Sequence, residues 1–130
     1  AALAAAAEEL GYDYHVGLTA STDSFYAGQG REGFGGFRAR GSEVDIQELK
    51  DAGVLNFEME ASAILTLANV YGLRAGAVCT VYADRTTGEF RTEGEGRAAA
   101  VASRAVSLLA SMDERAAAAD ADSWHAGLEL

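Results

Sequence analysis

The segment from Val54 to Gly72 constrains the fold most, because it joins a strand-like run to a helix-like run through a pair of acidic residues. Val54 to Phe57 is short and apolar, as expected of a strand. From Glu60 to Tyr71 apolar residues recur close to helical spacing, and Gly72 is a typical helix stop. The expected buried stripe of this helix is Ala61, Ile64, Leu65, Ala68 and Val70. A strand that leads directly into a helix predicts an α/β architecture.

Glu58 and Glu60 stand at this junction, with Met59 between them. In an extended stretch, residues two apart share a face, so both carboxylates point to one side. One interpretation is that an acidic side chain caps the helix, because the backbone dipole favours negative charge at a helix start. The other is that paired carboxylates accept hydrogen bonds from the vicinal hydroxyls of a polyhydroxylated ligand. The residues alone leave both interpretations open.

Strand-like and helix-like segments alternate along the chain. Further strands are predicted at Tyr14 to Ala20 and at Ala75 to Ala83, the latter apolar enough for a covered sheet. Further helices are predicted at Ala2 to Leu10, ended by Gly11, at Val44 to Asp51 and at about Arg97 to Arg115, the last with Val101, Ala105, Leu108 and Leu109 on one side. Polar loops fill Ser21 to Gly36 and Arg85 to Gly96. This order predicts helices on a mostly parallel or mixed sheet, with ligands at the strand C-terminal ends. We expect one domain portion at residues 1–115 and a tail at 116–130.

Composition excludes several classes of protein. A net charge of −10 argues against a nucleic acid or an anionic membrane as partner, because both require clustered Lys and Arg. Lys50 is the only lysine among 10 basic residues, and such an acidic surface is suited to high salt. The chain opening lacks the basic region of a secretory signal, so we expect a cytoplasmic protein. Cys79 is expected to be buried, and a single cysteine offers no disulfide or Cys/His metal site.

The run Gly28 to Gly33 formally matches the dinucleotide motif G-x-G-x-x-G. That motif must directly follow a strand and open a long helix, whereas residues 20–27 intervene here and more glycine follows. We therefore predict no NAD site. Gln29 and Arg31 within the run are more informative, because an amide and a planar guanidinium together match the carbonyl and N–H edge of a pyrimidine. Phe25 offers a ring for stacking. Taken alone, however, these residues favour the simpler interpretation of an exposed polar loop pinned to the core by Phe25.

Three segments of the chain, taken in order, resemble a known family. HVGLTASTDSFYAGQGRE, followed by GVLNFEMEASAILTLANVYGLRAGAV and ADRTTGE, is similar to the C-terminal half of the uridine phosphorylases, within the nucleoside phosphorylase superfamily. The likeness runs from about Ala1 to Met112. It implies a three-layer α/β/α fold with a mixed central sheet, and it leads us to expect that the N-terminal part of the fold is missing here.

The resemblance assigns roles to seven residues. The base-binding set it implies is Phe25, Gln29, Arg31 and Arg85, and the ribose-binding set is Glu58, Met59 and Glu60. Arg31 and Glu60 would be catalytic. Phosphorolysis passes through a ribosyl cation-like state, so a carboxylate near the sugar offsets developing positive charge, while donors at the base stabilise uracil as it departs as an anion.

The rest of the active site is expected elsewhere. In this family the phosphate site comes from the N-terminal half and from a neighbouring subunit, and nothing before Gly11 supplies it. Phosphate would be a co-substrate, and no metal or cofactor is implied. The resemblance implies a homo-oligomer, a hexamer built from dimers, and places activity in a longer chain than these residues.

Three alternatives stay open. Purine-specific relatives carry an aspartate at the position that aligns with Ala83, and Asp84 lies one residue further on. A nucleosidase of the same superfamily would use water in place of phosphate. A non-catalytic nucleoside-binding domain would keep only the base and ribose contacts.

Overall fold

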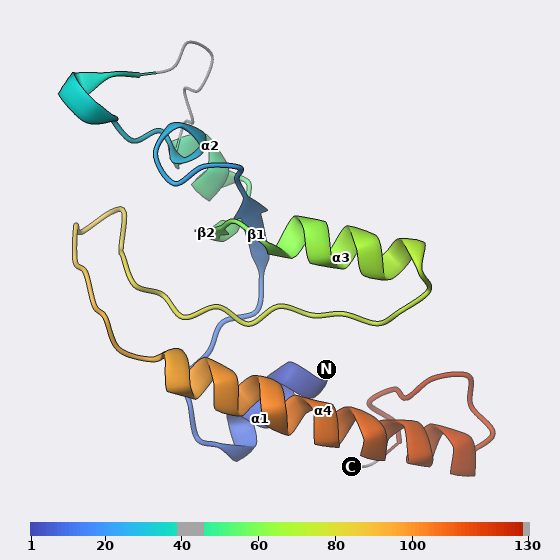
Figure 1. Ribbon diagram of the computed structural model, residues 1–130. Helices are drawn as coiled ribbons and strands as arrows, with labels where there is room; N and C mark the ends of the chain where they lie inside the picture. The colour runs from blue at the N-terminus through green and yellow to red at the C-terminus, as the bar shows by residue number, and fades with distance from the viewer. Residues whose placement is uncertain (39–45, 129–130) are drawn as a thin grey trace. The chain divides into compact units, whose positions relative to one another are not determined.

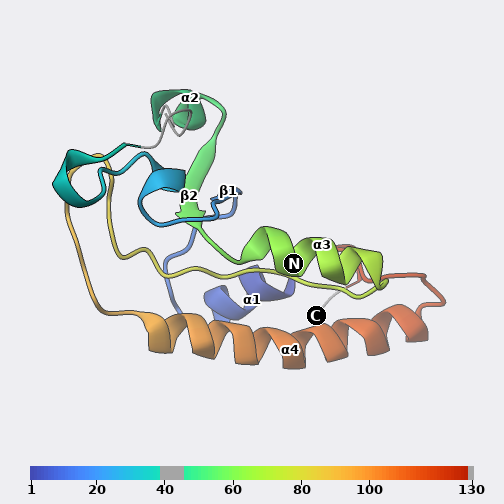
Figure 2. The ribbon, with the colours of Figure 1, turned by 45° about the horizontal axis from the view of Figure 1, so that its top comes forward.

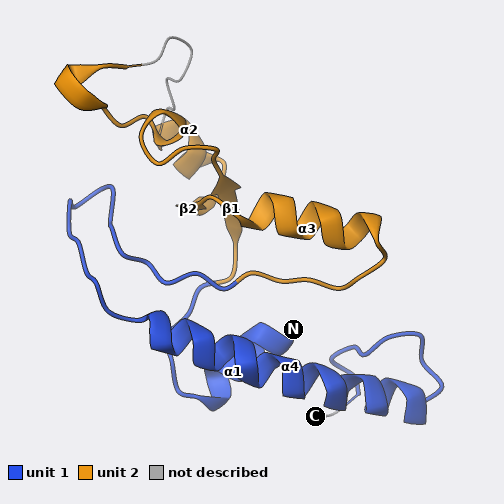
Figure 3. Cartoon of the chain, viewed as in Figure 1, with its two compact units in different colours: residues 1–15, 78–130 blue, residues 16–77 orange. Residues whose placement is uncertain are grey.

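The computed structural model describes residues 1–38 and 46–128, which fall into two compact units (Figure 3). Unit 1 comprises residues 1–15 and 78–130, and unit 2 comprises residues 16–77. Unit 1 contains helices α1 (Ala2–Glu9) and α4 (Glu95–Ala118), labelled in Figure 1. The elements of unit 2 are β1 (Leu18–Ser21), the 3₁₀ turns η1 (Ala27–Gln29) and η2 (Phe34–Gly36), α2 (Ile46–Asp51), β2 (Val54–Glu58) and α3 (Ala61–Val70). Helices combined with parallel strands make this an α/β fold, as predicted.

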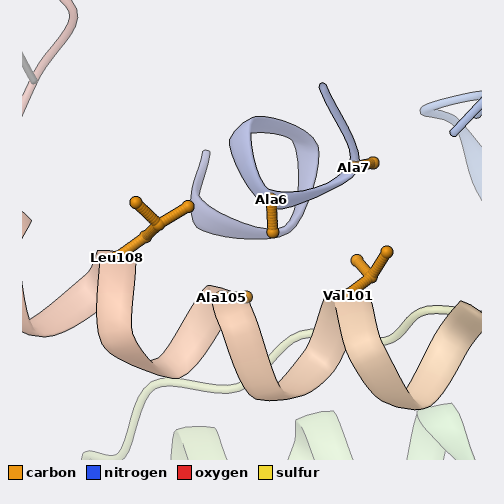
Figure 4. Packing of buried hydrophobic residues seen from close by; sticks show 5 residues of the cluster. All are labelled: Ala6, Ala7, Val101, Ala105 and Leu108. Carbon is orange, nitrogen blue, oxygen red and sulfur yellow. The ribbon is translucent and has the colours of Figure 1, made fainter. Parts of the chain in front are cut away.

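Unit 1 is held together by small side chains between its two helices (Figure 4). Val101, Ala105 and Leu108 recur at helical spacing on α4, and they pack against Ala6 and Ala7 of α1. Such small residues let two helix backbones approach closely. The helix predicted at Arg97 to Arg115 is therefore confirmed and longer than expected, although Leu109 is only half-buried.

Three helices end with the same hydrogen-bond pattern, in which the residue after the cap takes a left-handed conformation. Gly11 ends α1 with a φ of +68°, and Gly72 ends α3 with a φ of +65°. Both glycines were predicted as helix stops. At the end of α4 the left-handed residue is Asp120, with a φ of +52°, and Ala121 donates its amide proton to Ala116. Helix α4 continues to Ala118, and the division into a domain portion at residues 1–115 and a tail at 116–130 stays a prediction.

Unit 2 is built on a two-stranded parallel sheet formed by β1 and β2. The register pairs Ala20 with Phe57 and Ser21 with Glu58. Figure 2 shows β2 leading directly into α3, the junction from which the α/β architecture was inferred. The short helix before β2 is confirmed at Ile46–Asp51, whereas Val44 and Asp45, also predicted as helical, lie outside the described residues.

Two strand predictions were wrong in extent. The strand predicted at Tyr14 to Ala20 is limited to Leu18–Ser21, because its partner β2 begins only at Val54, after the left-handed Gly53. The apolar run Ala75 to Ala83 forms no strand, apart from one isolated antiparallel bridge between Ala83 and Phe90. A strand needs a hydrogen-bonding partner as well as a suitable sequence, and none of the described residues pairs with this run at length.

Burial predictions were also wrong at several apolar positions. On α3 only Ala61 of the expected stripe is buried and Ala68 is half-buried, while Ile64, Leu65 and Val70 are exposed. Cys79, expected to be buried, is exposed. Helical spacing identifies which residues favour burial, but burial requires a packing partner, which the described chain does not provide there. None of the described helices is both long and apolar enough to cross a membrane.

Candidate functional site

The candidate site gathers where β1 and β2 end within unit 2. Ser21 and Glu58 are paired in the register at the last position of the two strands. One residue further, the amide of Thr22 donates a hydrogen bond to the Glu58 carbonyl oxygen at 2.9 Å. The loop after β1 and the junction after β2 therefore leave the sheet side by side. Ligands bind at this edge in parallel α/β sheets.

Glu58 is the best-connected side chain of the junction. The Ser21 hydroxyl donates to Glu58 Oε1, while the backbone amides of Glu60 and Ala61 donate to Oε2, the first at 2.8 Å. Burial alone would raise the pKa of the Glu58 carboxyl, but these hydrogen bonds to its charged form outweigh burial and lower the pKa below its ordinary value. Glu58 thus holds the start of α3, as the capping interpretation describes.

Glu60 differs from Glu58 in its surroundings. It is the residue before the first turn of α3, and its side chain is exposed, accepting a hydrogen bond at 3.2 Å from the amide of Met59. Met59 is exposed as well. The two carboxylates therefore have different environments. Glu58 is used to hold the backbone, and Glu60 faces solvent at the same edge of the sheet.

The loop after β1 folds into a tight turn that carries Gln29 and Arg31. The Gly28 amide donates to the Ser24 hydroxyl at 2.7 Å, and a β-carbon on Gly28 would lie 2.9 Å from Asp23 Oδ1. A larger residue at this position would therefore require the Asp23 side chain to shift. The turn contains the short η1 instead of the start of a long helix, so the run Gly28 to Gly33 lacks the context of a dinucleotide motif.

Gln29 and Arg31 are both turned inward. Gln29 is 5% exposed, and its Nε2 donates to the Thr22 hydroxyl at 3.4 Å. The Arg31 guanidinium carbon lies 4.4 Å from the centroid of the Phe25 ring, within the range of a cation–π contact. Phe25 is exposed rather than pinned in a core. The Arg31 Nε is buried and has no hydrogen-bond partner among residues 1–38 and 46–128. A buried donor without a partner is costly, and a ligand acceptor would satisfy it.

Arg85 lies in unit 1, in the turn that follows Ala83, and it is half-buried. The neighbouring Asp84 carboxylate accepts hydrogen bonds from the amides of Thr86 at 2.6 Å and Thr87 at 3.1 Å. These bonds, the Thr86 bond foremost, hold the pKa of Asp84 below its ordinary value. The Asp84 side chain therefore stabilises its own turn, and Arg85 is presented by that turn.

Ser21 and Thr22 were not identified from the sequence as site residues. Their signal was present, since two hydroxyl residues directly follow the strand predicted at Tyr14 to Ala20, at the position where strand ends carry binding groups. What sequence could not supply was the register that pairs Ser21 with Glu58. In the described part of the chain, no cluster of His, Cys, Asp and Glu side chains is arranged to hold a metal ion.

The profile of the phosphorylase superfamily matches residues 1–112 of the chain. The chain belongs to this superfamily. It is 54% identical, over 127 residues, to the uridine phosphorylase of Thermococcus kodakarensis, a match that covers 98% of this chain and 46% of that protein. It is 43% identical over 89 residues to the uridine phosphorylase of Escherichia coli, covering 68% of this chain and 35% of that protein.

A relative that is named for a different activity also matches. The chain is 42% identical over 89 residues to the DeoD-type purine nucleoside phosphorylase of Listeria monocytogenes, covering 68% of this chain and 32% of that protein. The chain spans less than half the length of these curated relatives.

Proposed function

We propose that this chain forms the nucleoside-binding part of a uridine phosphorylase, a pentosyltransferase that converts uridine and phosphate reversibly to uracil and ribose 1-phosphate. The observation that carries the proposal is the inward-turned pair on the loop after β1. Gln29 is buried there, and Arg31 holds a buried Nε donor without a partner in the described residues. The uridine phosphorylases among the relatives support the same activity.

Base binding is assigned to Gln29, Arg31 and Phe25. A guanidinium and an amide offer N–H donors to uracil carbonyls, and the amide carbonyl accepts from the ring N–H. The contact between Phe25 and the guanidinium orients Arg31, so that it meets the base with its planar edge. As the glycosidic bond breaks, negative charge grows on uracil and Arg31 stabilises it, which makes Arg31 a catalytic residue.

Ribose binding is assigned to the junction of β2 and α3. Glu60 is the exposed carboxylate at this edge, and it would accept hydrogen bonds from the 2′-hydroxyl. Its charge also offsets the positive charge that develops on the sugar, which makes Glu60 the second catalytic residue. Met59 would pack against the sugar ring. Glu58 would contribute to ribose binding indirectly, by fixing the start of α3, because its carboxylate already accepts hydrogen bonds from Ser21, Glu60 and Ala61.

Uridine is favoured over purine nucleosides by two observations. Gln29 and Arg31 suit the edge of a pyrimidine. In addition, Asp84 is occupied by the amides of its own turn, and Ala83, at the position of the purine-specific aspartate, has no polar side chain. The family resemblance also assigns Arg85 to base binding, and this assignment stays a prediction. A purine nucleoside phosphorylase is the second candidate, on the strength of the DeoD-type relative.

The remaining features belong to the whole protein and stay part of the proposal. They comprise a three-layer α/β/α fold with a mixed sheet, a phosphate site outside the residues assigned here, a homo-oligomer and a cytoplasmic location. Phosphate acts as a co-substrate, and the residues assigned above need no metal to perform their roles.

The test is turnover of uridine, with inosine in parallel, in high salt that screens the net charge of −10. Products are separated with and without phosphate. Phosphate-dependent release of uracil and ribose 1-phosphate supports the proposal. Free ribose without phosphate identifies a nucleosidase, and faster cleavage of inosine identifies a purine enzyme. Uridine binding without turnover is the result expected of a chain whose phosphate site lies outside the residues assigned here, whereas a folded chain that does not bind uridine would overturn the proposal.

A further inference from the structure

We propose that Ser21 is a positioning residue for the ribose end of the site: its hydroxyl holds the Glu58 carboxylate against the start of α3 and thereby fixes the backbone that carries Glu60. This inference rests on the proposed function, since it concerns the residues assigned to ribose. It adds a residue from β1 to which neither the resemblance nor the comparisons assign a role.

The first step is the double role of the Ser21 hydroxyl. It donates to Glu58 Oε1, and its oxygen accepts a hydrogen bond from the amide of Ser62 at 2.9 Å. A hydroxyl can donate and accept at once, whereas a methyl group can do neither. Ser21 thus connects the end of β1 both to the last residue of β2 and to the first turn of α3.

The second step is the connection from Glu58 to Glu60. Glu58 Oε2 accepts hydrogen bonds from the backbone amides of Glu60 and Ala61. The carboxylate that is bound by Ser21 therefore also fixes the backbone at Glu60. A carboxylate has about four acceptor positions, and three are filled here by protein donors. Glu58 therefore has little capacity left for a sugar. Its contribution is to set the place from which Glu60 projects.

The third step is the contrast with Glu60 itself. Glu60 has a φ of −125° and a ψ of −32°, a conformation outside the helix that follows, and its side chain is exposed. A residue in such a conformation at a helix start is kept in place by the hydrogen bonds of its amide. Loss of Ser21 would release one oxygen of Glu58, loosen that amide bond and let the Glu60 carboxylate move away from the sugar.

The experiment compares the binding of uridine and of uracil to the parent protein and to the variants Ser21→Ala and Ser21→Thr. Dissociation constants come from chemical-shift titrations. The Glu58 carboxyl carbon is titrated with pH in the same samples. Ser21→Thr keeps the hydroxyl and serves as the conservative control. Uracil lacks the sugar, so it reports on the base site and on the integrity of unit 2.

For Ser21→Ala we expect about tenfold weaker uridine binding, the effect of one lost hydrogen bond to a charged group, with uracil binding unchanged. We also expect a higher pKa of Glu58. Ser21→Thr should behave like the parent protein in both measurements. Equal weakening of uridine and uracil would overturn the proposal, because it would indicate a general loss of structure. Unchanged uridine binding by Ser21→Ala would overturn it too.

Failure of the proposed function is distinguishable from failure of this inference. If the parent protein binds neither uracil nor uridine, the proposed function fails. In that case the pH titration decides alone: a Glu58 pKa raised by Ser21→Ala and restored by Ser21→Thr supports the positioning role, and an unchanged pKa refutes it.

Discussion

Replacing Glu58 with glutamine should destabilise the protein, whereas the same change at Glu60 should not. Glu58 accepts hydrogen bonds from the Ser21 hydroxyl and from the amides of Glu60 and Ala61. Glu60 accepts one bond, from the adjacent Met59 amide. The pair forms a matched comparison, because both positions belong to one junction and both substitutions remove one charge without changing size.

The magnitude follows from the three bonds. Charge-assisted hydrogen bonds are roughly twice as strong as neutral ones, so loss of the charge should cost about 0.5 kcal/mol for each bond. The favourable interaction of the carboxylate with the start of α3 adds about 0.5 kcal/mol. Glu58→Gln should therefore lower the free energy of unfolding by about 2 kcal/mol. Glu60→Gln should change it by less than about 0.5 kcal/mol, as expected of an exposed position.

The stabilisation by the Glu58 carboxylate should also depend on pH, and it should weaken in acid. The pKa of Glu58 is lowered on folding, so its charged form stabilises the folded state. That stabilisation is fully present above the unfolded pKa of about 4.3, and it is lost as the pH falls through this value toward the folded pKa. The difference between the parent protein and Glu58→Gln should be constant at neutral pH and shrink in acid.

Urea denaturation followed by circular dichroism, at neutral pH and at several acidic values, measures these differences. Two results would refute the reasoning. One is a Glu58→Gln variant as stable as the parent at neutral pH. The other is an equal loss for Glu60→Gln, since this would mean that net charge, and not the hydrogen bonds of Glu58, sets the stability of the junction.

Three further predictions follow from burial and turn geometry. Leu108→Ala should lower the free energy of unfolding by about 2 kcal/mol, as measured by urea denaturation. This is the low end for such a change, because the surrounding core consists largely of small residues that can relax around the cavity. Ile64→Ser on the exposed side of α3 should cost less than about 0.5 kcal/mol, and a loss of several kcal/mol would mean that this side chain is buried. Gly28→Ala should weaken uracil binding, because the new β-carbon would lie 2.9 Å from Asp23 Oδ1 and 3.2 Å from Thr22 Cβ and would displace these side chains. Unchanged binding would mean that the turn accommodates the added methyl group.

The sequence predicted best the features that depend on residues near one another in the chain. Helix α1 and the end of α3 were predicted from helical spacing and from Gly11 and Gly72, whose left-handed conformations the structure confirms. The end of α4 was missed because the residue that takes this conformation is Asp120, a type that also occurs inside helices and loops. A glycine there would have identified the boundary.

Features that depend on distant partners could not be predicted. The run Ala75 to Ala83 has the composition of a strand, yet a strand exists only with a neighbour to pair with. In the same way the two acids of the junction look alike in sequence. Only the register that sets Ser21 beside Glu58 distinguishes the carboxylate that caps α3 from the one that is exposed.

The central claim is that this chain binds the base and the ribose of a nucleoside with two different groups of residues. Dissociation constants for uracil and uridine, measured by calorimetry, test this claim most directly. Gln29→Glu keeps the size of the buried side chain but removes its donor, so it should weaken both ligands by at least about tenfold. Glu60→Gln should weaken uridine and leave uracil unchanged. If both variants bound both ligands as the parent does, the assigned residues would not form the nucleoside site.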